Sequence, residues 1–353
     1  MFGSVRLLLA ICVALSHVGV TVWGYNPGPI AVISFYLISG YVTAGLLDKQ
    51  LVRAVDYYIE RALRLLPSYW VALALAAAIW MMVPQPNDIY FLQRVPGWID
   101  WASNLAIVPL NFYMWSGQDQ FTLIPPAWSL AAEFQFYALA PWILRAPRWG
   151  SIAIMTASFS IWLVAQAGML QTDWWGYRLL PGILFVFILG TRIYRAEKVV
   201  PAAVWLLAMI VFVGVMTALF KIQPFNVETS IGLLLGIPLL TLLSRLPRRR
   251  WDDFIGRLAY PMFLLHFPMM WVFENLGYAP SYLLKKPQAL LAWLGCTLIA
   301  SQLLYLLTEA PLMRLRHSLR RDYHDDRPFS IWRRWIGSMR SVSAGDDRIV
   351  KRS

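Results

Sequence analysis

The most informative residues of this sequence are titratable side chains within long apolar stretches: His17, Glu133 and His266. Charged and titratable groups are costly inside a membrane and are usually retained there for function. An imidazole near a carboxylate is a common arrangement for general acid–base chemistry near neutral pH. We therefore interpret the three residues as candidate acid–base groups. The alternative is that each one only forms a hydrogen bond between packed helices.

The depths of these three side chains favour a common site. With about 1.5 Å of helical rise per residue, His17 lies roughly 18–20 Å from the inner start of its apolar segment. His266 lies about 15 Å from the inner end of its segment, and Glu133 lies about 9 Å deep from the opposite side. The sequence thus predicts a shared polar cavity in the outer half or the middle of the bilayer.

Two further charged residues stand at the ends of apolar segments and have plainer alternatives. Arg6 begins the first segment, where an arginine can serve as an anchor whose head group extends to the inner surface. Glu309 stands where the last segment ends, and a local pair with Arg314 or Arg316 would account for it.

Arg61 and Arg64 form a second constellation, on the expected cytoplasmic side. They are three residues apart and share one face if the segment is helical, just before Pro67, where we expect the third span to begin. Guanidinium groups bind phosphate oxygens bidentately, so the pair suits a phosphorylated cytosolic cosubstrate. Ordinary positive charge on the inner side explains the same residues without a ligand.

Several other kinds of site have no support in the sequence. It contains no Walker loop, no GxGxxG motif and no metal-ligand spacing, so nucleotide hydrolysis, redox chemistry and a bound metal are not expected. Both cysteines, Cys12 and Cys296, lie inside apolar runs, which indicates neither a disulfide framework nor a zinc site.

Composition identifies the class of protein. Of the 353 residues, 59% are hydrophobic and 14% are charged, whereas soluble domains carry about 25% charged residues. The net charge of +12 would suit a nucleic-acid partner, but the basic residues form clusters between apolar runs rather than one basic face. We therefore expect an all-α, polytopic membrane bundle that contacts lipid and binds no nucleic acid.

Ten segments are apolar enough over about 20 residues to span a bilayer. They are 4–22, 28–47, 66–83, 127–144, 150–168, 178–195, 199–219, 227–245, 256–276 and 288–308. The stretch 84–126 is polar and rich in proline, so it is expected to be an outer loop whose apolar part, 101–112, is re-entrant or interfacial rather than an eleventh span.

The distribution of basic residues predicts the orientation. With the N-terminus in the cytoplasm, the inner loops contain 14 Lys and Arg residues and the tail 314–353 contains 11, against four in the outer loops. This bias predicts that both termini are cytoplasmic. We expect a membrane domain over residues 1–313 and a basic cytoplasmic tail, which either lies on the anionic inner leaflet or is partly disordered.

Six short motifs occur in a fixed order along the membrane part. They are Arg6 followed eleven residues later by His17; Phe35-Tyr36-Leu37-Ile38-Ser39-Gly40-Tyr41; Arg61-x-x-Arg64 with Pro67 and Tyr69; Trp128-Ser129-Leu130-Ala131-Ala132-Glu133-Phe134-Gln135-Phe136-Tyr137; Tyr260 to Pro268 with His266; and Glu309-Ala310-Pro311. Together they resemble the integral-membrane acyltransferase-3 family, the O-acyltransferases of bacterial surface glycans and of some secreted small molecules. Two departures are Glu60, where a basic residue is usual, and a single acidic residue at 132–134.

The resemblance implies an O-acyltransferase of the bacterial inner membrane. It would transfer an acyl group, most simply acetyl, from cytoplasmic acyl-CoA to a hydroxyl of an extracytoplasmic glycan such as exopolysaccharide or O-antigen. Arg61 and Arg64 would hold the CoA phosphates and His17 would be the central catalytic residue, as base or acyl carrier.

The remaining candidates would support that chemistry. Arg6 would orient the thioester or stabilise an oxyanion. Glu133 would orient or charge His17 or its substrate, and His266 would assist. Ser39 and Gly40 more plausibly permit close helix packing than supply a nucleophile.

Other interpretations remain open at the level of sequence. The donor can be succinyl-CoA, and the acceptor can be a secondary metabolite. Intramembrane His and Glu also mark transporters and flippases of lipid-linked intermediates, and a non-catalytic partner of a glycan-synthesis complex would tolerate loss of His17. Aromatic residues of the outer loop can stack on sugars or belong to the interfacial belt: Trp98, Trp101, Tyr113 and Trp115.

Overall fold

The chain folds as a bundle of helices in a computed structural model, which describes residues 2–49, 53–82, 91–195, 212, 215, 223–247 and 249–313. Within those ranges the only extended pairings are two isolated bridges, and no strand is formed. The predicted all-α class is therefore confirmed for the described part of the chain.

Among the described residues, six helical segments are long and apolar enough to cross a membrane, so the protein is a multi-pass membrane protein. They are α2 (Pro27–Lys49), α3 (Ala54–Met82), α7 (Arg148–Gln166), η3 with α8 (Thr172–Arg178 and Leu180–Tyr194), α10 (Asn226–Arg245), and α14 with η4 (Pro287–Leu304 and Tyr305–Glu309). Three more predicted spans correspond to α1 (Gly3–His17), α6 (Ala127–Arg145) and α12 (Ala259–Asn275). The one remaining predicted span, 199–219, lies outside the described residues apart from positions 212 and 215.

The first helix is shorter than the expected segment 4–22. It ends at His17 because the chain turns through Gly19, whose φ of +90° suits glycine. Fifteen residues rise about 22 Å, less than the roughly 30 Å of a hydrocarbon core. His17 is thus the last residue of a helix that is too short to cross the membrane alone.

The third helix is longer than predicted. It begins at Ala54, so Pro67 lies inside α3 rather than opening it, and the prediction that the span begins there is wrong. Proline removes one backbone hydrogen bond from a helix, but a helix inside a membrane bundle can continue through it because neighbouring helices and Ser or Thr side chains satisfy the freed backbone groups. The extension carries Arg61 and Arg64 on helical turns within the bundle.

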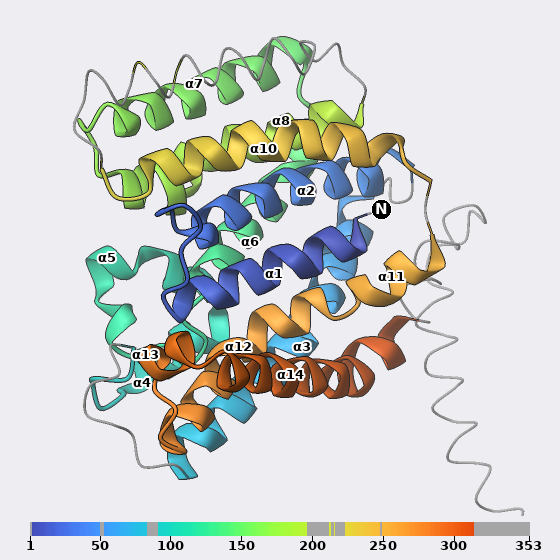
Figure 1. Ribbon diagram of the computed structural model, residues 1–353. Coiled ribbons are helices and arrows are strands. Elements are labelled where there is room, and N and C mark those ends of the chain that lie inside the picture. The colour runs from blue at the N-terminus through green and yellow to red at the C-terminus, as the bar shows by residue number, and fades with distance from the viewer. Residues whose placement is uncertain are drawn as a thin grey trace, which may run out of the picture.

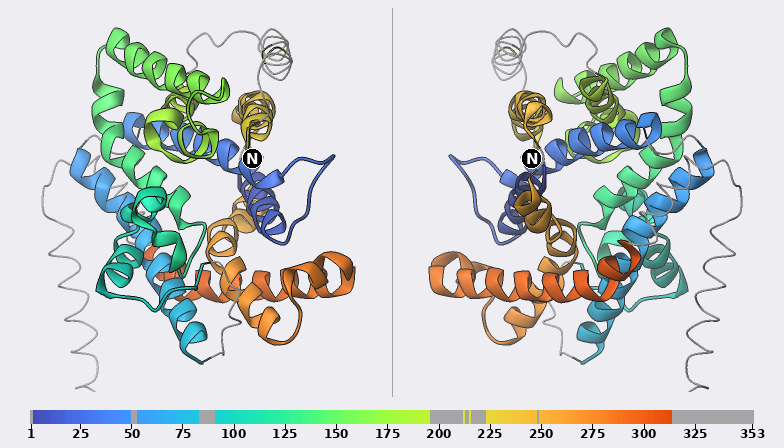
Figure 2. Two further views of the ribbon diagram at one scale, coloured as in Figure 1. Left: turned by 90° about the vertical axis from the view of Figure 1, so that its left-hand side faces the viewer. Right: turned by 90° about the vertical axis from the view of Figure 1, so that its right-hand side faces the viewer.

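The helices are arranged around α1 (Figure 1). On one side lie α2, α8 and α10, with α7 beyond them; on the other lie α12, α3 and α14. In the turned view α10 is seen end-on, whereas α3 and α14 are seen from the side, so the helices cross at different angles (Figure 2).

Close packing between α2 and α8 depends on two glycines. A Cβ on Gly40 would lie 1.9 Å from the Phe187 carbonyl oxygen, and one on Gly190 would lie 2.1 Å from that of Leu37. The two backbones can approach only because neither glycine has a side chain. The interpretation of Gly40 as a packing residue is confirmed.

The bundle has two distinct ends (Figure 1). The start of α1 and the short helix α11 (Arg250–Gly256) lie at one, which we call the α11 end. The other, the α5 end, carries α4 (Trp98–Ala106), α5 (Tyr113–Ser116) and α13 (Pro280–Lys285). Between α4 and α5 the chain breaks at Ile107, with φ +67°, before the 3-10 turn η1 (Val108–Phe112). None of these short helices could cross a bilayer.

Candidate active site

Arg64 and Glu309 form a buried ion pair between α3 and η4. Nη1 of Arg64 donates to Oε2 of Glu309, and the two side chains are 12% and 6% exposed. The guanidinium also lies over the ring of Tyr260, 5.2 Å from its centroid. Glu309 therefore has a partner that is distant in sequence; Arg314 and Arg316, the local partners suggested by the sequence, lie outside the described residues. η4 is a π-helical turn, a geometry frequent at functional sites.

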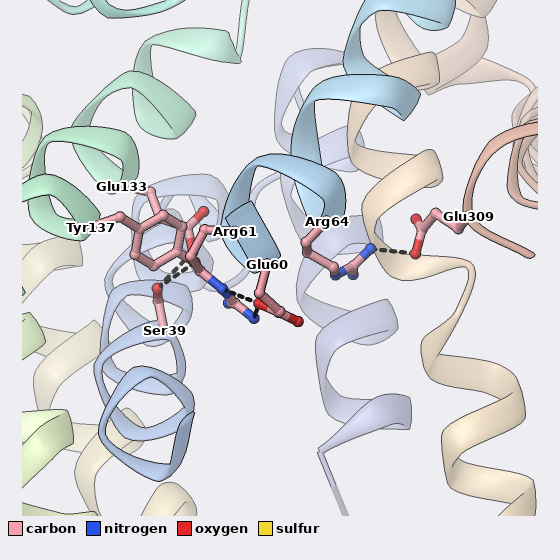
Figure 3. A network of polar contacts seen from close by, with 7 residues as sticks. All are labelled: Ser39, Glu60, Arg61, Arg64, Glu133, Tyr137 and Glu309. Carbon is pink, nitrogen blue, oxygen red and sulfur yellow. Dashed lines mark hydrogen bonds and ion pairs between the residues drawn. The ribbon is translucent and has the colours of Figure 1, made fainter. Parts of the chain in front are cut away.

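Arg61 is buried beside its own sequence neighbour. Its Nε donates to Oε2 of Glu60 at 2.6 Å, Glu60 is fully buried, and the guanidinium lies 5.4 Å from the centroid of the Tyr137 ring. Figure 3 shows the Arg61 side chain directed toward α6 and that of Arg64 directed toward Glu309. The two arginines thus lie inside the bundle with carboxylate partners, not at an open inner surface.

Glu133 on α6 is held by two hydroxyl groups (Figure 3). Ser39 Oγ donates to Glu133 Oε1 at 2.6 Å, and Tyr137 OH, one turn further along α6, donates to the same oxygen. The hydroxyl oxygens of Ser39 and Tyr137 lie 3.1 Å apart. Ser39 is therefore a polar partner of Glu133, and only its neighbour Gly40 serves packing. The sequence carried both residues in its motifs but gave no sign of this contact.

Arg6 interacts with both of these groups. Its guanidinium is electrostatically coupled to Arg64 and Glu309 and also to Glu133 and Tyr137. It forms no hydrogen bond or ion pair with another side chain of the described ranges. A cation without such a partner, placed among polar groups inside a membrane bundle, is expected to meet a substrate.

His17 and His266 lie together toward the α5 end. Their rings stack at 5.4 Å between centroids with an interplanar angle of 23°, and Phe267 contacts both rings. His266 is fully buried, its Nδ1 lies 3.3 Å from the Met262 carbonyl oxygen, and its Nε2 has no hydrogen-bond partner in the described structure. His17, by contrast, is accessible. The pair presents one reachable imidazole supported by one buried imidazole.

The three expected acid–base residues form two groups rather than one. No contact between Glu133 and His17 occurs among the described residues; Glu133 is grouped with Arg6, and His17 with His266. Eleven residues of α1 separate Arg6 from His17, which corresponds to about 16 Å. The interior polar groups thus extend along α1 instead of converging on one cavity.

Arg178 is a charged residue near His17 that the sequence analysis did not select. Its Nε donates to Oδ1 of Asp173 at 2.8 Å, its guanidinium lies 4.2 Å from the Trp128 ring centroid, and it interacts electrostatically with His17. Asp173 and Arg178 both belong to η3, a second π-helical turn. In sequence Arg178 stands at the start of an apolar run, where an interfacial charge is ordinary.

Asn111 fixes the backbone around Arg178. Its Nδ2 donates to the carbonyl oxygens of Trp128 and Arg178, both at 3.1 Å, and its Oδ1 accepts from Gln135 at 3.0 Å. Three residues of the motif from Trp128 to Tyr137 thus have a defined contact: Trp128 lies against Arg178, Glu133 accepts a hydrogen bond from Ser39, and Gln135 donates one to Asn111. In the described ranges, no cluster of three or more His, Cys, Asp or Glu side chains is placed to bind a metal.

Comparison with known proteins gives a consistent match. The family model described as an acyltransferase domain matches residues 3–306. The chain is 26% identical to "Acyltransferase MdmB" of Streptomyces mycarofaciens over 327 residues, which are 82% of this chain and 81% of that protein. It is 30% identical to an uncharacterized protein of Aquifex aeolicus over 211 residues, 56% of this chain and 91% of the relative.

A third relative matches a smaller part. The chain is 28% identical over 145 residues to "Putative O-acetyltransferase SACOL0978" of Staphylococcus aureus (strain COL). The match covers 37% of this chain and 23% of that protein. No solved structure matches the chain.

Proposed function

This chain belongs to the acyltransferase-3 family, and from that premise we propose that it transfers an acyl group to a hydroxyl of a saccharide. We propose acetyl as the group and acetyl-CoA as its donor, with succinyl-CoA as the alternative donor. The observation that supports this best is the accessible His17 imidazole, which ends a short helix and stacks on the buried His266. An imidazole in such a position is suited to accept and return a proton.

The arginines suit an anionic donor. A guanidinium has five N–H groups, so the single carboxylate beside Arg61 or Arg64 does not use all of them, and Arg6 has none within hydrogen-bond distance among the described residues. Three guanidinium groups toward the α11 end can therefore bind phosphates of CoA. The chain of interior polar groups along α1 would lead its extended thioester arm toward His17.

The proposed reaction is a simple group transfer. His17 accepts the proton of the acceptor hydroxyl while that oxygen attacks the thioester carbonyl, a C–O bond forms and the C–S bond breaks. His17 then gives the proton to the departing thiolate, so CoA leaves as a thiol. Arg178, which interacts electrostatically with His17, is placed to stabilise the negative charge that develops on the carbonyl oxygen. Arg6, about 16 Å away along α1, is too far for that role and would act on the donor.

We further propose the topology that this reaction needs. Ten spans with both termini in the cytoplasm of a bacterial inner membrane would put the α11 end inside and the α5 end outside. The donor would then enter from the cytoplasm, and the acceptor from the opposite face. Basic residues concentrated around α11 favour this orientation.

Purified protein in nanodiscs with radiolabelled acetyl-CoA tests the proposal. We expect saturable donor binding in the wild type and CoA release once a saccharide acceptor is added, loss of turnover with His17→Ala, and a raised KM for acetyl-CoA with Arg61→Ala/Arg64→Ala. Wild-type protein that binds neither acetyl-CoA nor succinyl-CoA would reject the donor. Function retained by His17→Ala would instead point to a transporter or a non-catalytic partner.

A further inference from the structure

Two segments distant in sequence are joined at the α5 end, residues 111–116 and η3 at 172–178. Tyr113 OH donates to Asp173 Oδ2 at 3.2 Å, and Asn111 donates to the Arg178 carbonyl oxygen. On the outer side of these hydrogen bonds, the Trp115 ring lies 6.2 Å from Trp174. One contact region therefore has a polar interior and an aromatic exterior.

The exterior is a set of rings that we call the aromatic shelf: Phe112, Trp115, Trp174 and Trp175. Phe112 and Trp115 stack at 6.2 Å with an interplanar angle of 22°, and Trp175 lies 6.4 Å from Trp115. Trp115 is 59% exposed and Phe112 is 37% exposed. Large rings on this surface therefore remain open to a ligand.

The shelf continues inward through charged groups to the catalytic candidate. Exposure falls from Trp115 to the half-buried Tyr113 and the fully buried Asn111. Asp173 and Arg178 lie on the same π-helical turn as the shelf tryptophans, and Arg178 interacts electrostatically with His17. Aromatic rings, a carboxylate and a guanidinium thus follow one another from the surface toward the accessible imidazole.

We propose that this region is the binding site for the acceptor saccharide, an inference that rests on the proposed function. A pyranose has an apolar C–H face that packs on aromatic rings and a rim of hydroxyls that pair with carboxylate and guanidinium groups. The aromatic shelf would take the ring face, while Asp173, Tyr113 and Arg178 would bind hydroxyls and direct one of them toward His17. Rings that only anchor the protein at a membrane surface need no connection to an interior ion pair. The aromatic shelf has such a connection, because Trp174 and Trp175 lie on the same turn as the Asp173–Arg178 ion pair.

The test measures donor and acceptor steps separately on the full chain in nanodiscs. Binding of radiolabelled acetyl-CoA without acceptor reports the donor step, and acyl transfer is measured to methyl glycosides of glucose, galactose, mannose and N-acetylglucosamine. The variants are Trp115→Ala, Trp174→Ala and Trp115→Phe, which keeps a ring. Trp142→Ala is the matched control because Trp142 is 74% exposed at the other end of α6.

We expect Trp115→Ala and Trp174→Ala to raise the KM for the accepted glycoside about tenfold, the effect of losing one stacking contact. The KM for acetyl-CoA and the binding of acetyl-CoA without acceptor should be unchanged, and Trp115→Phe should recover most of the affinity for the glycoside. Trp142→Ala should behave as the wild type.

Three results would be contrary. An unchanged acceptor KM in both shelf variants, with folded yields lowered equally in Trp115→Ala and Trp142→Ala, would identify interfacial anchors and overturn the site. Saturable acetyl-CoA binding by the wild type without acylation of any of the four glycosides would overturn the saccharide as occupant while leaving donor binding standing. Absence of donor binding in the wild type would reject the proposed function itself.

Discussion

The guanidinium of Arg64 and the carboxylate of Glu309 meet inside the bundle although 245 residues separate them in the chain. The pair joins α3 to the π-helical turn that follows α14, directly beside a second contact, in which the hydroxyls of Ser68 and Thr308 lie 2.7 Å apart. This arrangement holds the two helices in register at the part of the bundle that Arg6 faces. The pair is therefore expected to matter for stability as well as for donor binding.

Arg64→Ala should destabilise the protein by about 3–5 kcal/mol, because it leaves the buried Glu309 carboxylate without its counter-ion. Arg64→Met/Glu309→Leu should regain most of that stability without regaining activity, since it removes both charges. Thermal unfolding in detergent, followed by tryptophan fluorescence, measures both effects.

The control for this prediction is a pair on the protein surface. Arg53, just before α3, and Asp56, in its first turn, form an ion pair with 2.8 Å between Nε and Oδ2. Arg53→Ala should cost at most about 1 kcal/mol, because solvent screens a surface pair. Equal losses of stability in Arg53→Ala and Arg64→Ala would show that the buried Arg64–Glu309 pair contributes no more to stability than a surface ion pair does.

The carboxylate of Glu133 has a different role, since its oxygen is bound by hydroxyls and its charge faces Arg6. Glu133→Gln keeps the size and an acceptor oxygen but removes the charge, so we expect a kcat about 100-fold lower with a nearly unchanged unfolding temperature. Ser39→Ala removes one hydrogen bond and should lower kcat about tenfold or less. Steady-state kinetics of both variants measure these losses. A wild-type kcat in Glu133→Gln would show that catalysis needs no negative charge beside Arg6.

Hydropathy and residue spacing predict the helical class and most helix positions, because a bilayer requires long apolar segments with internally bonded backbones. They fail at α3, where the polar residues before Pro67 suggested a loop. That stretch is helical because its polar side chains find partners inside the bundle, as Arg64 does with Glu309. Hydropathy treats each charge as exposed unless its partner is known, and such a partner can be anywhere in the chain.

In the candidate site, too, the sequence predicts positions along a helix but not the contacts between residues that are far apart in the chain. Spacing placed Arg6 and His17 on one helix, and depth placed His17 and His266 at similar levels, where their rings stack. Depth alone gives no lateral position, so it did not reveal that Glu133 is grouped with Arg6. Arg178 was not selected because its position at the start of an apolar run is ordinary; only the fold shows it beside Trp128 and near His17.

The two histidines should differ sharply under substitution. His17→Asn should lower kcat by about 10²–10⁴-fold, the usual contribution of a proton-transferring side chain, with little change in the KM for acetyl-CoA. His266→Phe keeps a ring stacked on His17 but removes both nitrogen atoms, so a loss of about tenfold is expected. Initial rates of CoA release with the two variants side by side measure the difference. Equal losses would assign the chemistry to the pair rather than to His17.

The start of α1 is held by a residue from another helix, and this makes stability depend on pH. Asp252 of α11 accepts hydrogen bonds from the Gly3 N–H at 2.9 Å, the Ser4 N–H at 2.9 Å and the Ser4 hydroxyl at 2.7 Å. Burial raises the pKa of Asp252, but the hydrogen bonds from Ser4 and Gly3 outweigh it, so the net pKa is lower than the ordinary 3.8.

Because the folded-state pKa of Asp252 is lowered, its contribution to stability is complete above the ordinary pKa and is lost as pH falls through the lowered value. Asp252→Asn presents an amide N–H₂ to one of these donors, so the variant should unfold at a lower temperature than the wild type by a constant margin between about pH 5 and 8. Below about pH 4 the margin should shrink as the wild-type carboxylate takes up its proton. The exposed neighbour Asp253 gives the matched control, Asp253→Asn, which should follow the wild type at every pH. A margin for Asp252→Asn that stayed constant down to pH 2 would mean that neutral Asp252 holds the start of α1 as well as the carboxylate does, and would contradict a stabilising role for the ionised form.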